Sequence, residues 1–185
     1  HFGLLSAAVM VYAILADLLV TPVLLLQTRL ITVWDLIGMR LTENVVKRSE
    51  LFTEMSPWQI KKVILLGRIE EVERGAYIIR QGEREQTMYL LLEGEAKVEH
   101  IAQDGRATEL SILKEGDVFG EIALVNEVER TANVIAVNEA KVLSIEEEDL
   151  KRVHRFYPRI SLHLFMNLSR ILGKRLMQAN IRLSE

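Results

Sequence analysis

The sequence contains no cysteine among its 185 residues, so disulfides and thiolate metal sites are excluded. It has only four histidines, and their spacing matches neither H-x-H nor H-E-x-x-H, so we expect no metal site. It also lacks an excess of positive charge, because 23 Lys and Arg are balanced by 26 Asp and Glu, which gives a net charge of −3. Surfaces that bind nucleic acid are normally basic, so we expect no nucleic acid among the partners.

The beginning of the chain almost lacks charge. Residues 2–26 read FGLLSAAVMVYAILADLLVTPVLLL, with Asp17 as the only charged side chain. A run of this length can cross the ~30 Å hydrocarbon layer of a bilayer, and it has no polar stripe of the kind that core helices show. We therefore predict a transmembrane helix at 1–28. Because Asp17 would be costly in lipid, we expect other transmembrane helices as partners besides the lipid bilayer.

No basic residue precedes the apolar run. Four follow it: Arg29, Arg40, Lys47 and Arg48. By the positive-inside rule, the C-terminal side of the helix faces the cytoplasm. We therefore expect a protein of the cell membrane with a juxtamembrane linker at 29–50 and with residues 29–185 in the cytoplasm. Because the chain begins with histidine, we also expect it to be the C-terminal part of a longer protein.

The stretch GLLSAAVMVYAILADLLVTPVLLL resembles the last transmembrane helix of hydrophobe exporters of the resistance-nodulation-division superfamily. In those proteins an Asp-Leu-Leu run shortly before Pro-x-Leu-Leu is common. The resemblance implies that the rest of the chain is attached to a membrane transporter.

The remainder of the chain has the pattern of a β-rich domain between helices. From Arg68 to Ile145, short apolar stretches alternate with glycine-containing turns, which predicts an antiparallel β-roll, that is, a double-stranded β-helix or jelly roll. Before it, SPWQIKKVILLG has Ser56 to cap a helix, Pro57 for its first turn and Gly67 for its end. The predicted fold class is therefore α+β: a β-roll flanked by helices and preceded by one transmembrane helix.

Helical periodicity returns after Ile145. The segment EEEDLKRVHR begins with acidic residues that favour a helix N-terminus, and Pro158 begins a second, longer helix. Apolar residues repeat along one face of this helix, at Leu164, Leu168, Leu172, Leu176, Ala179 and Leu183. Such a face can be plain core, a lid over a pocket or the seam of a homo-oligomer, and the pattern alone leaves these open.

The segment FGEIALVNEVERTANV, residues 119–134, carries the chemistry. Gly120 lets the backbone approach a ligand without a Cβ, and the short helical turn EIALVN presents free N–H groups that suit a phosphate. Arg130 has a planar fork that matches two phosphate oxygens, whereas Glu121 would repel a phosphate and should accept from a sugar hydroxyl. The alternative is a Glu121–Arg130 salt bridge that closes the loop.

The runs GDVFGEIAL and RTANV resemble the phosphate-binding cassette of cyclic-nucleotide-binding domains. The similarity continues in order along residues 50–185, so we predict this domain at 51–185. The resemblance implies that the ligand is cAMP or cGMP, with no further cofactor. The ligand-binding residues that it implies are Phe119, Gly120, Glu121, Ile122, Ala123, Arg130, Thr131 and Ala132.

The resemblance implies a role for each of these residues. The amides at Gly120, Ile122 and Ala123 would hold the cyclic phosphate, and Arg130 would pair with it. Glu121 would accept from the ribose 2′-hydroxyl. The resemblance also implies roles for three further residues. Phe119 ends the strand before the cassette, and Thr131 would offer a hydroxyl near the phosphate and base. Ala132 would keep the space beside the base small.

The predicted function is that of a cytoplasmic cyclic-nucleotide sensor that regulates an attached membrane transporter. The alternative is the regulatory domain of a cyclic-nucleotide-gated ion channel. A transcription factor is disfavoured by the acidic balance and by the absence of a helix-turn-helix after the last helix. No serine has a G-x-S-x-G context and Glu121 has no partner acid in the pattern, so we expect no catalytic residues and no enzyme.

Overall fold

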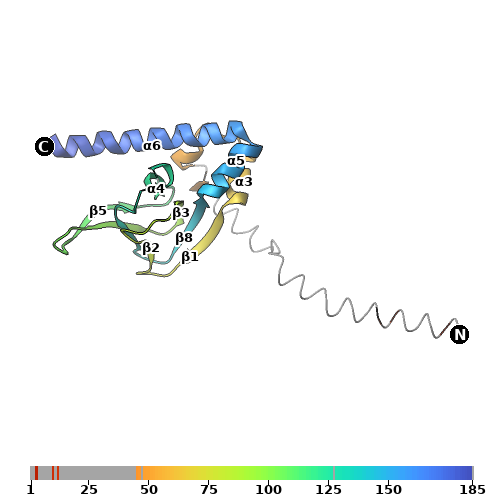
Figure 1. Ribbon diagram of the computed structural model, residues 1–185, viewed down its shortest axis with the longest axis horizontal. Coiled ribbons are helices and arrows are strands. Elements are labelled where there is room, and N and C mark those ends of the chain that lie inside the picture. The colour runs from red at the N-terminus through yellow and green to blue at the C-terminus, as the bar shows by residue number, and fades with distance from the viewer. Residues whose placement is uncertain are drawn as a thin grey trace. The chain divides into compact units, whose positions relative to one another are not determined.

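The computed structural model describes Gly3, Met10, Tyr12 and residues 45–46, 48–126 and 128–184. From residue 41 onward the chain forms one compact unit, drawn as the coloured ribbon in Figure 1. Except for three residues, the predicted transmembrane helix at 1–28 lies outside the described residues, as does most of the predicted linker at 29–50. None of the helices in the described part is long and apolar enough to cross a membrane.

Two four-stranded antiparallel sheets form the centre of the unit. The strand order is β1-β8-β3-β6 in the first sheet and β2-β7-β4-β5 in the second. The strands are β1 (Arg68–Val72), β2 (Tyr77–Ile79), β3 (Thr87–Glu93), β4 (Ala96–Ile101), β5 (Ala107–Leu113), β6 (Val118–Phe119), β7 (Asn133–Ala136) and β8 (Ala140–Glu146). Strands β4 and β5 are consecutive and pair with each other, but the other neighbours are not consecutive in sequence, as where Leu90 pairs with Leu143 and Val98 with Val134. The predicted β-roll is confirmed.

Strand β3 is buried on both of its faces, which explains why its sequence TMYLLL does not alternate between apolar and polar residues. Met88, Leu90 and Leu92 point to one hydrophobic cluster, which the helices share. Tyr89 and Leu91 point to the other cluster, which lies between the two sheets. The roll therefore has a core inside it and a second core beneath its helices.

Short helices precede and interrupt the roll. The 3-10 helix η1 (Glu50–Phe52) is followed by α3 (Pro57–Leu66), and α4 (Glu121–Asn126) lies between β6 and β7. The predicted cap of α3 is present: Gln59 N donates to Ser56 Oγ over 3.4 Å, and Ser56 N donates to Gln59 Oε1 over 2.8 Å. This reciprocal pair fixes the start of α3 at Pro57.

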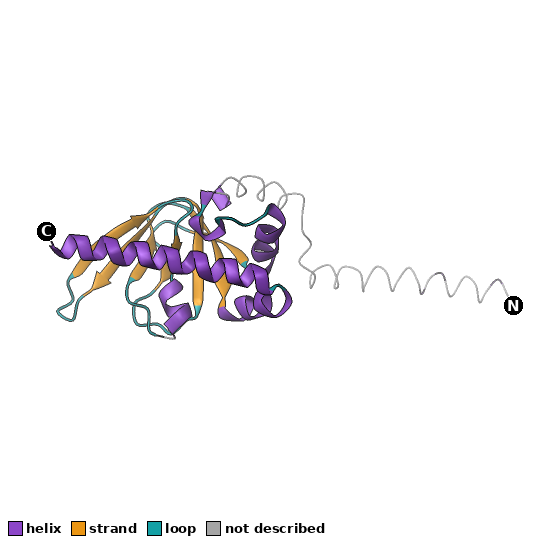
Figure 2. Cartoon of the chain, turned by 90° about the horizontal axis from the view of Figure 1, so that it is seen from above, coloured by secondary structure: helices purple, strands orange, loops and turns teal. Residues whose placement is uncertain are grey.

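Two helices follow the roll, α5 (Glu147–Phe156) and α6 (Pro158–Ser184). Figure 2 shows α6 as a long, straight helix that runs across the strands. Ile160, Leu164, Leu168 and Ile171 of α6 are buried in the cluster beneath the helices, so the first half of α6 belongs to the core. Its second half extends over α4 and β5 (Figure 1), and Arg175, Gln178 and Ala179 from this half share a cavity with strand residues.

Candidate functional site

The site is built around Gly120, which joins β6 to α4. Gly120 has φ +76°, a left-handed conformation that a residue with a side chain rarely adopts. A Cβ at this position would lie 2.8 Å from Arg130 Nη1, 3.0 Å from Ile79 Cδ1 and 3.0 Å from the Thr87 carbonyl oxygen. Glycine is therefore required both by the backbone conformation and by the close approach of Arg130.

Arg130 comes from the loop between α4 and β7 and is only 5% exposed. Its Nη1 donates to the Gly120 carbonyl over 2.8 Å, and its Nη2 donates to the Thr87 carbonyl over 2.6 Å. These bonds fix the plane of the guanidinium, but Nε is buried without any hydrogen-bond partner in the part of the chain that the structure describes. Burial lowers the pKa of Arg130 from its ordinary value, since the charged form is partly desolvated.

Glu121 lies at the first position of α4 and is 1% exposed. Its carboxylate does not pair with Arg130. Instead it accepts a hydrogen bond from Nη1 of Arg175, a residue of α6, whose Nη2 donates to the Val118 carbonyl. The salt bridge that the sequence left open between Glu121 and Arg130 is thus replaced by one to the last helix.

A cavity of about 600 Å³ brings these groups together. Every ligand-binding residue predicted from the sequence lines it: Phe119, Gly120, Glu121, Ile122, Ala123, Arg130, Thr131 and Ala132. Phe119 and Ala123 are buried, whereas the side chain of Ile122 is largely exposed. Thr131 is exposed, and its carbonyl oxygen lies 3.0 Å from His100 Nδ1.

No ligand contact was predicted from the sequence for the strand residues that complete the cavity, nor for Arg175 and Gln178 of α6. Apolar side chains from the strands line it, including Ile79, Val98 and Val134, and α6 contributes Arg175, Gln178 and Ala179. The α6 residues have the spacing i, i+3 and i+4, which places them on one helical face. A lid over a pocket was one of the three roles that the sequence left open for this helix, with Ala179 on its apolar face, but the pattern did not single out Arg175 or Gln178.

The arrangement suits a ligand that carries one anionic group and a hydroxyl. The buried Arg130 can receive an anion, Glu121 can accept from a donor, and the apolar strand residues can contact a ring. Within the described ranges, no group of three or more His, Cys, Asp and Glu side chains could hold a metal ion.

Comparison with known proteins identifies a related domain independently of the site geometry. Residues 69–155 match the family model described as "Cyclic nucleotide-binding domain". The chain is 28% identical over 138 residues to the cyclic AMP receptor protein of Thermus thermophilus, which covers 75% of this chain and 62% of that protein. It is 33% identical over 119 residues to a protein described as a candidate potassium channel of Rhodopseudomonas palustris, which covers 64% of this chain and 28% of that one.

Among solved structures, the crystal structure of the Thermus thermophilus catabolite activator protein has a TM-score of 0.67 at 28% identity. The match covers 74% of this chain and 62% of that chain. The chain thus spans less than two thirds of the length of each of these relatives. Family match, fold and cassette agree that residues 69–155 are a cyclic nucleotide-binding domain, and this part of the chain belongs to that family.

Proposed function

We propose that this protein senses a cyclic nucleotide, cAMP or cGMP, which binds in the cavity between the cassette and α6. The proposal rests on the burial of the Arg130 cation without an anionic partner in the described part of the chain. Arg130 is 5% exposed, and among the described residues its Nε has no hydrogen-bond partner and no carboxylate lies within salt-bridge distance of it. A buried, uncompensated cation is costly, and a phosphate that enters the cavity would remove that cost.

Cyclic phosphate fits the geometry better than a larger anion. It carries a single negative charge, which one buried guanidinium can balance, and its exocyclic oxygens suit an arginine fork. The amides of Gly120, Ile122 and Ala123 would complete its coordination. Glu121 would accept from the ribose 2′-hydroxyl, while Thr131 and Ala132 would border the phosphate and base.

The test is calorimetric titration of the whole chain in detergent with cAMP and with cGMP, and with 5′-AMP as the control. AMP has the same base and sugar but a dianionic, open phosphate, so we expect it to bind at least about tenfold more weakly. Absence of heat with both cyclic nucleotides at millimolar concentration would contradict the proposal. A preference between cAMP and cGMP in the same titrations would identify the base.

The proposal extends to what the sensor regulates. We propose that it controls a membrane transporter to which it is attached through the helix at 1–28 and the linker at 29–50, with residues 29–185 in the cytoplasm. This part is supported by the apolar run at 2–26 and by the basic residues that follow it. Ligand binding would regulate transport only as far as it favours one of two states of the protein.

An ion channel is the second candidate for the attached protein, and a specific observation favours it. The 33% identical relative from Rhodopseudomonas palustris is described as a candidate potassium channel. Reconstitution of the protein in proteoliposomes distinguishes the two, since a channel passes Rb⁺ down its gradient when cyclic nucleotide is added. A transporter would leave Rb⁺ flux unchanged. Incubation with cAMP should yield no AMP, because we propose no catalysis.

A further inference from the structure

The corner where α3 meets the end of α5 and the start of α6 carries an aromatic groove that the nucleotide site does not use. The groove has a volume of about 620 Å³, and Trp58, Tyr157, Pro158 and Ile160 are among the residues that line it. Trp58 and Tyr157 meet edge to face with their ring centroids 5.8 Å apart. Trp58 is nevertheless 57% exposed, and Phe156 beside the groove is 64% exposed. Such exposure of large aromatic rings at one place indicates an interaction surface.

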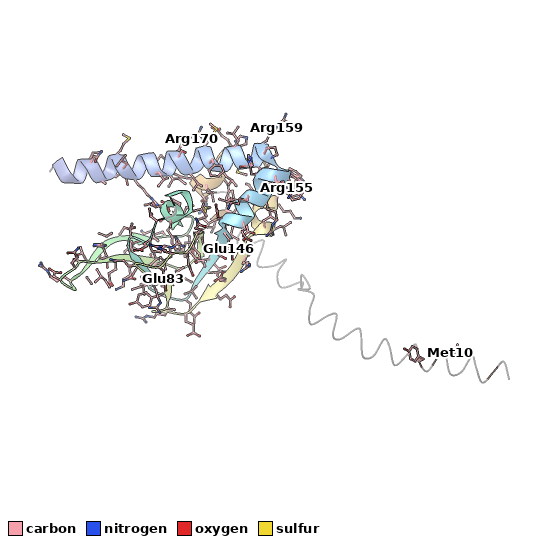
Figure 3. All side chains as sticks on the ribbon, viewed as in Figure 1. Met10, Glu83, Glu146, Arg155, Arg159 and Arg170 are labelled. Carbon is pink, nitrogen blue, oxygen red and sulfur yellow. The ribbon has the colours of Figure 1, made fainter. Side chains whose placement is uncertain are left out.

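Basic side chains surround these rings. Lys62 Nζ lies 5.5 Å from the ring centroids of both Trp58 and Tyr157, and the Arg155 guanidinium lies 5.8 Å from that of Phe156. Figure 3 labels Arg155 and Arg159 where α5 ends and α6 begins, and Arg159 also lines the groove. We call this surface the basic aromatic corner; it consists of Trp58, Lys61, Lys62, Arg155, Phe156 and Arg159.

Among the described residues, no carboxylate neutralises the charges of the basic aromatic corner. Lys151 and Arg152, one turn earlier on α5, have carboxylate partners in Glu147 and Asp149, at 2.8 Å and 3.6 Å. A second group of cations has no carboxylate within salt-bridge distance in the described part of the chain: Lys61, Lys62, Arg155 and Arg159. The corner therefore presents four positive charges around exposed aromatic rings, none of them paired with a carboxylate of the described residues.

We propose that the basic aromatic corner docks on the surface of an anionic lipid bilayer. Lysine and arginine attract anionic headgroups, while tryptophan and phenylalanine prefer the boundary between headgroups and acyl chains. An acidic protein could satisfy the charges as well, but cations directly beside exposed rings are the arrangement that anchors a protein at the headgroup layer. Docking would hold the sensor in one orientation against a membrane, and it depends neither on the bound nucleotide nor on the helix proposed at 1–28.

Trp58 provides a direct readout of docking. The chain has two tryptophans, so the Trp34→Phe variant leaves Trp58 as its single indole. The whole chain would be combined with vesicles of brominated phosphatidylcholine, either alone or with about 30 mol% phosphatidylserine. We expect bromine to quench Trp58 emission in the anionic vesicles, and ~0.5 M salt to reverse the quenching.

A matched pair of variants tests the residues. Each cation near an anionic surface raises association about fivefold, so replacing Lys61, Lys62, Arg155 and Arg159 by Gln should weaken docking by more than about 100-fold. Replacing Arg74, Arg84, Arg106 and Lys114 by Gln changes the net charge equally at other sites and should leave docking intact. Both variants should bind cyclic nucleotide like the parent, which shows that they are folded.

Three results would overturn the proposal. The first is equal quenching in neutral and anionic vesicles, since the apolar run at 2–26 alone would then account for the association. The second is equal loss of quenching in the two quadruple variants, because only net charge would matter. The third is a shift of Trp58 emission with poly-glutamate but not with anionic vesicles, which would assign the corner to an acidic protein.

Discussion

The carboxylate of Glu121 is held by Arg175, a residue of α6 that lies 54 positions later in the sequence. Arg175 also donates to the Val118 carbonyl, so one side chain ties α6 to both ends of the β6–α4 connection. Glu121 is also the group expected to accept a hydrogen bond from the ligand. A bound nucleotide and Arg175 of α6 would therefore both bond to the same carboxylate. A change at one of them must then affect the other, to the extent that their free energies are coupled.

We predict that Arg130→Lys reduces cyclic nucleotide affinity by about 10- to 150-fold, as expected for loss of a charge-assisted hydrogen bond of ~1.5–3 kcal/mol. Lysine keeps the charge but cannot donate to the Gly120 and Thr87 carbonyls and to a phosphate in one plane. Titration calorimetry measures the affinity. The matched control is Arg106→Lys, because Arg106 pairs with Asp104 at the surface and neither residue lines the cavity, so the nucleotide affinity of this variant should be unchanged. Equal losses in both variants would count against a role for Arg130 in binding.

The pair between Glu121 and Arg175 should be measurable as a coupling energy. We predict that Arg175→Gln destabilises the ligand-free protein more in the presence of Glu121 than in the Glu121→Gln background, because it leaves a buried carboxylate unpaired. The Arg175 side chain is 40% exposed, so solvent screens the pair and the coupling should be about 1 kcal/mol. Urea unfolding of the two single variants and the double variant gives the value, and strict additivity would show that the pair contributes nothing.

Gly120→Ala should lower both stability and affinity. The left-handed conformation costs a residue with a side chain ~1–2 kcal/mol, and the added Cβ would press on Arg130 Nη1 at 2.8 Å. Gly105→Ala is the control, because Gly105 has φ +81° but nothing within 4 Å of the added Cβ, and its N–H donates to the Ala102 carbonyl away from the cavity. We expect Gly105→Ala to lose only the conformational part and to keep nucleotide affinity. If the two variants bind equally well, the close packing of Gly120 against Arg130 is not needed for the site.

The strands were predictable because their residues are local signals. The stretches RIEEV and ATELSIL coincide with β1 and β5, and TMYLLL lies within β3. Turn glycines and short apolar runs depend only on neighbouring residues, so the pattern survives without knowledge of the partners. The pairing of β3 with β8 depends on contacts between distant residues, and no spacing in the sequence indicates it.

The cassette was predictable residue by residue, whereas for the last helix a lid over the pocket was only one of three roles that the pattern left open. Residues 119–132 are adjacent in sequence, and their types match a ligand with a phosphate and a hydroxyl. Arg175, by contrast, is one of several arginines on α6, and only the packing of the helix across the roll selects it as the partner of Glu121. For the same reason, the alternative of a Glu121–Arg130 bridge could not be rejected from the sequence.

Stability should fall at high pH because of Tyr89. Burial raises its pKa to about 12, whereas the phenol of an unfolded chain has a pKa of about 10. The folded state therefore retains the proton, so this contribution is fully present below about pH 10 and is lost as pH rises toward 12, by up to ~2–3 kcal/mol. Chemical unfolding across this range should show a steeper fall for the parent than for Tyr89→Phe. Equal slopes would mean that Tyr89 is not the group responsible.

Asn167 joins α6 to η1 in the interior, and we predict that Asn167→Leu lowers stability by about 2–3 kcal/mol. Its Nδ2 donates to the carbonyls of Leu51 and Thr53, each over 2.9 Å, and the side chain is buried. Leucine has a similar size but no donor, so it would leave two carbonyls without these bonds. Hydrogen exchange should then accelerate in residues 49–53, the segment that these bonds hold against α6.

A serine two residues further along α6 provides the comparison for Asn167. Ser169 Oγ donates over 2.8 Å to the Phe165 carbonyl of its own helix, and the residue is exposed. Ser169→Ala should therefore change stability by no more than ~0.5 kcal/mol and leave exchange near η1 unaltered. If Asn167→Leu slows or leaves unchanged the exchange of residues 49–53, η1 is held by its buried Leu51 and Phe52 instead. If exchange accelerates there and nucleotide affinity falls as well, the bonds of Asn167 connect the segment that leads into the roll with the helix that covers its ligand.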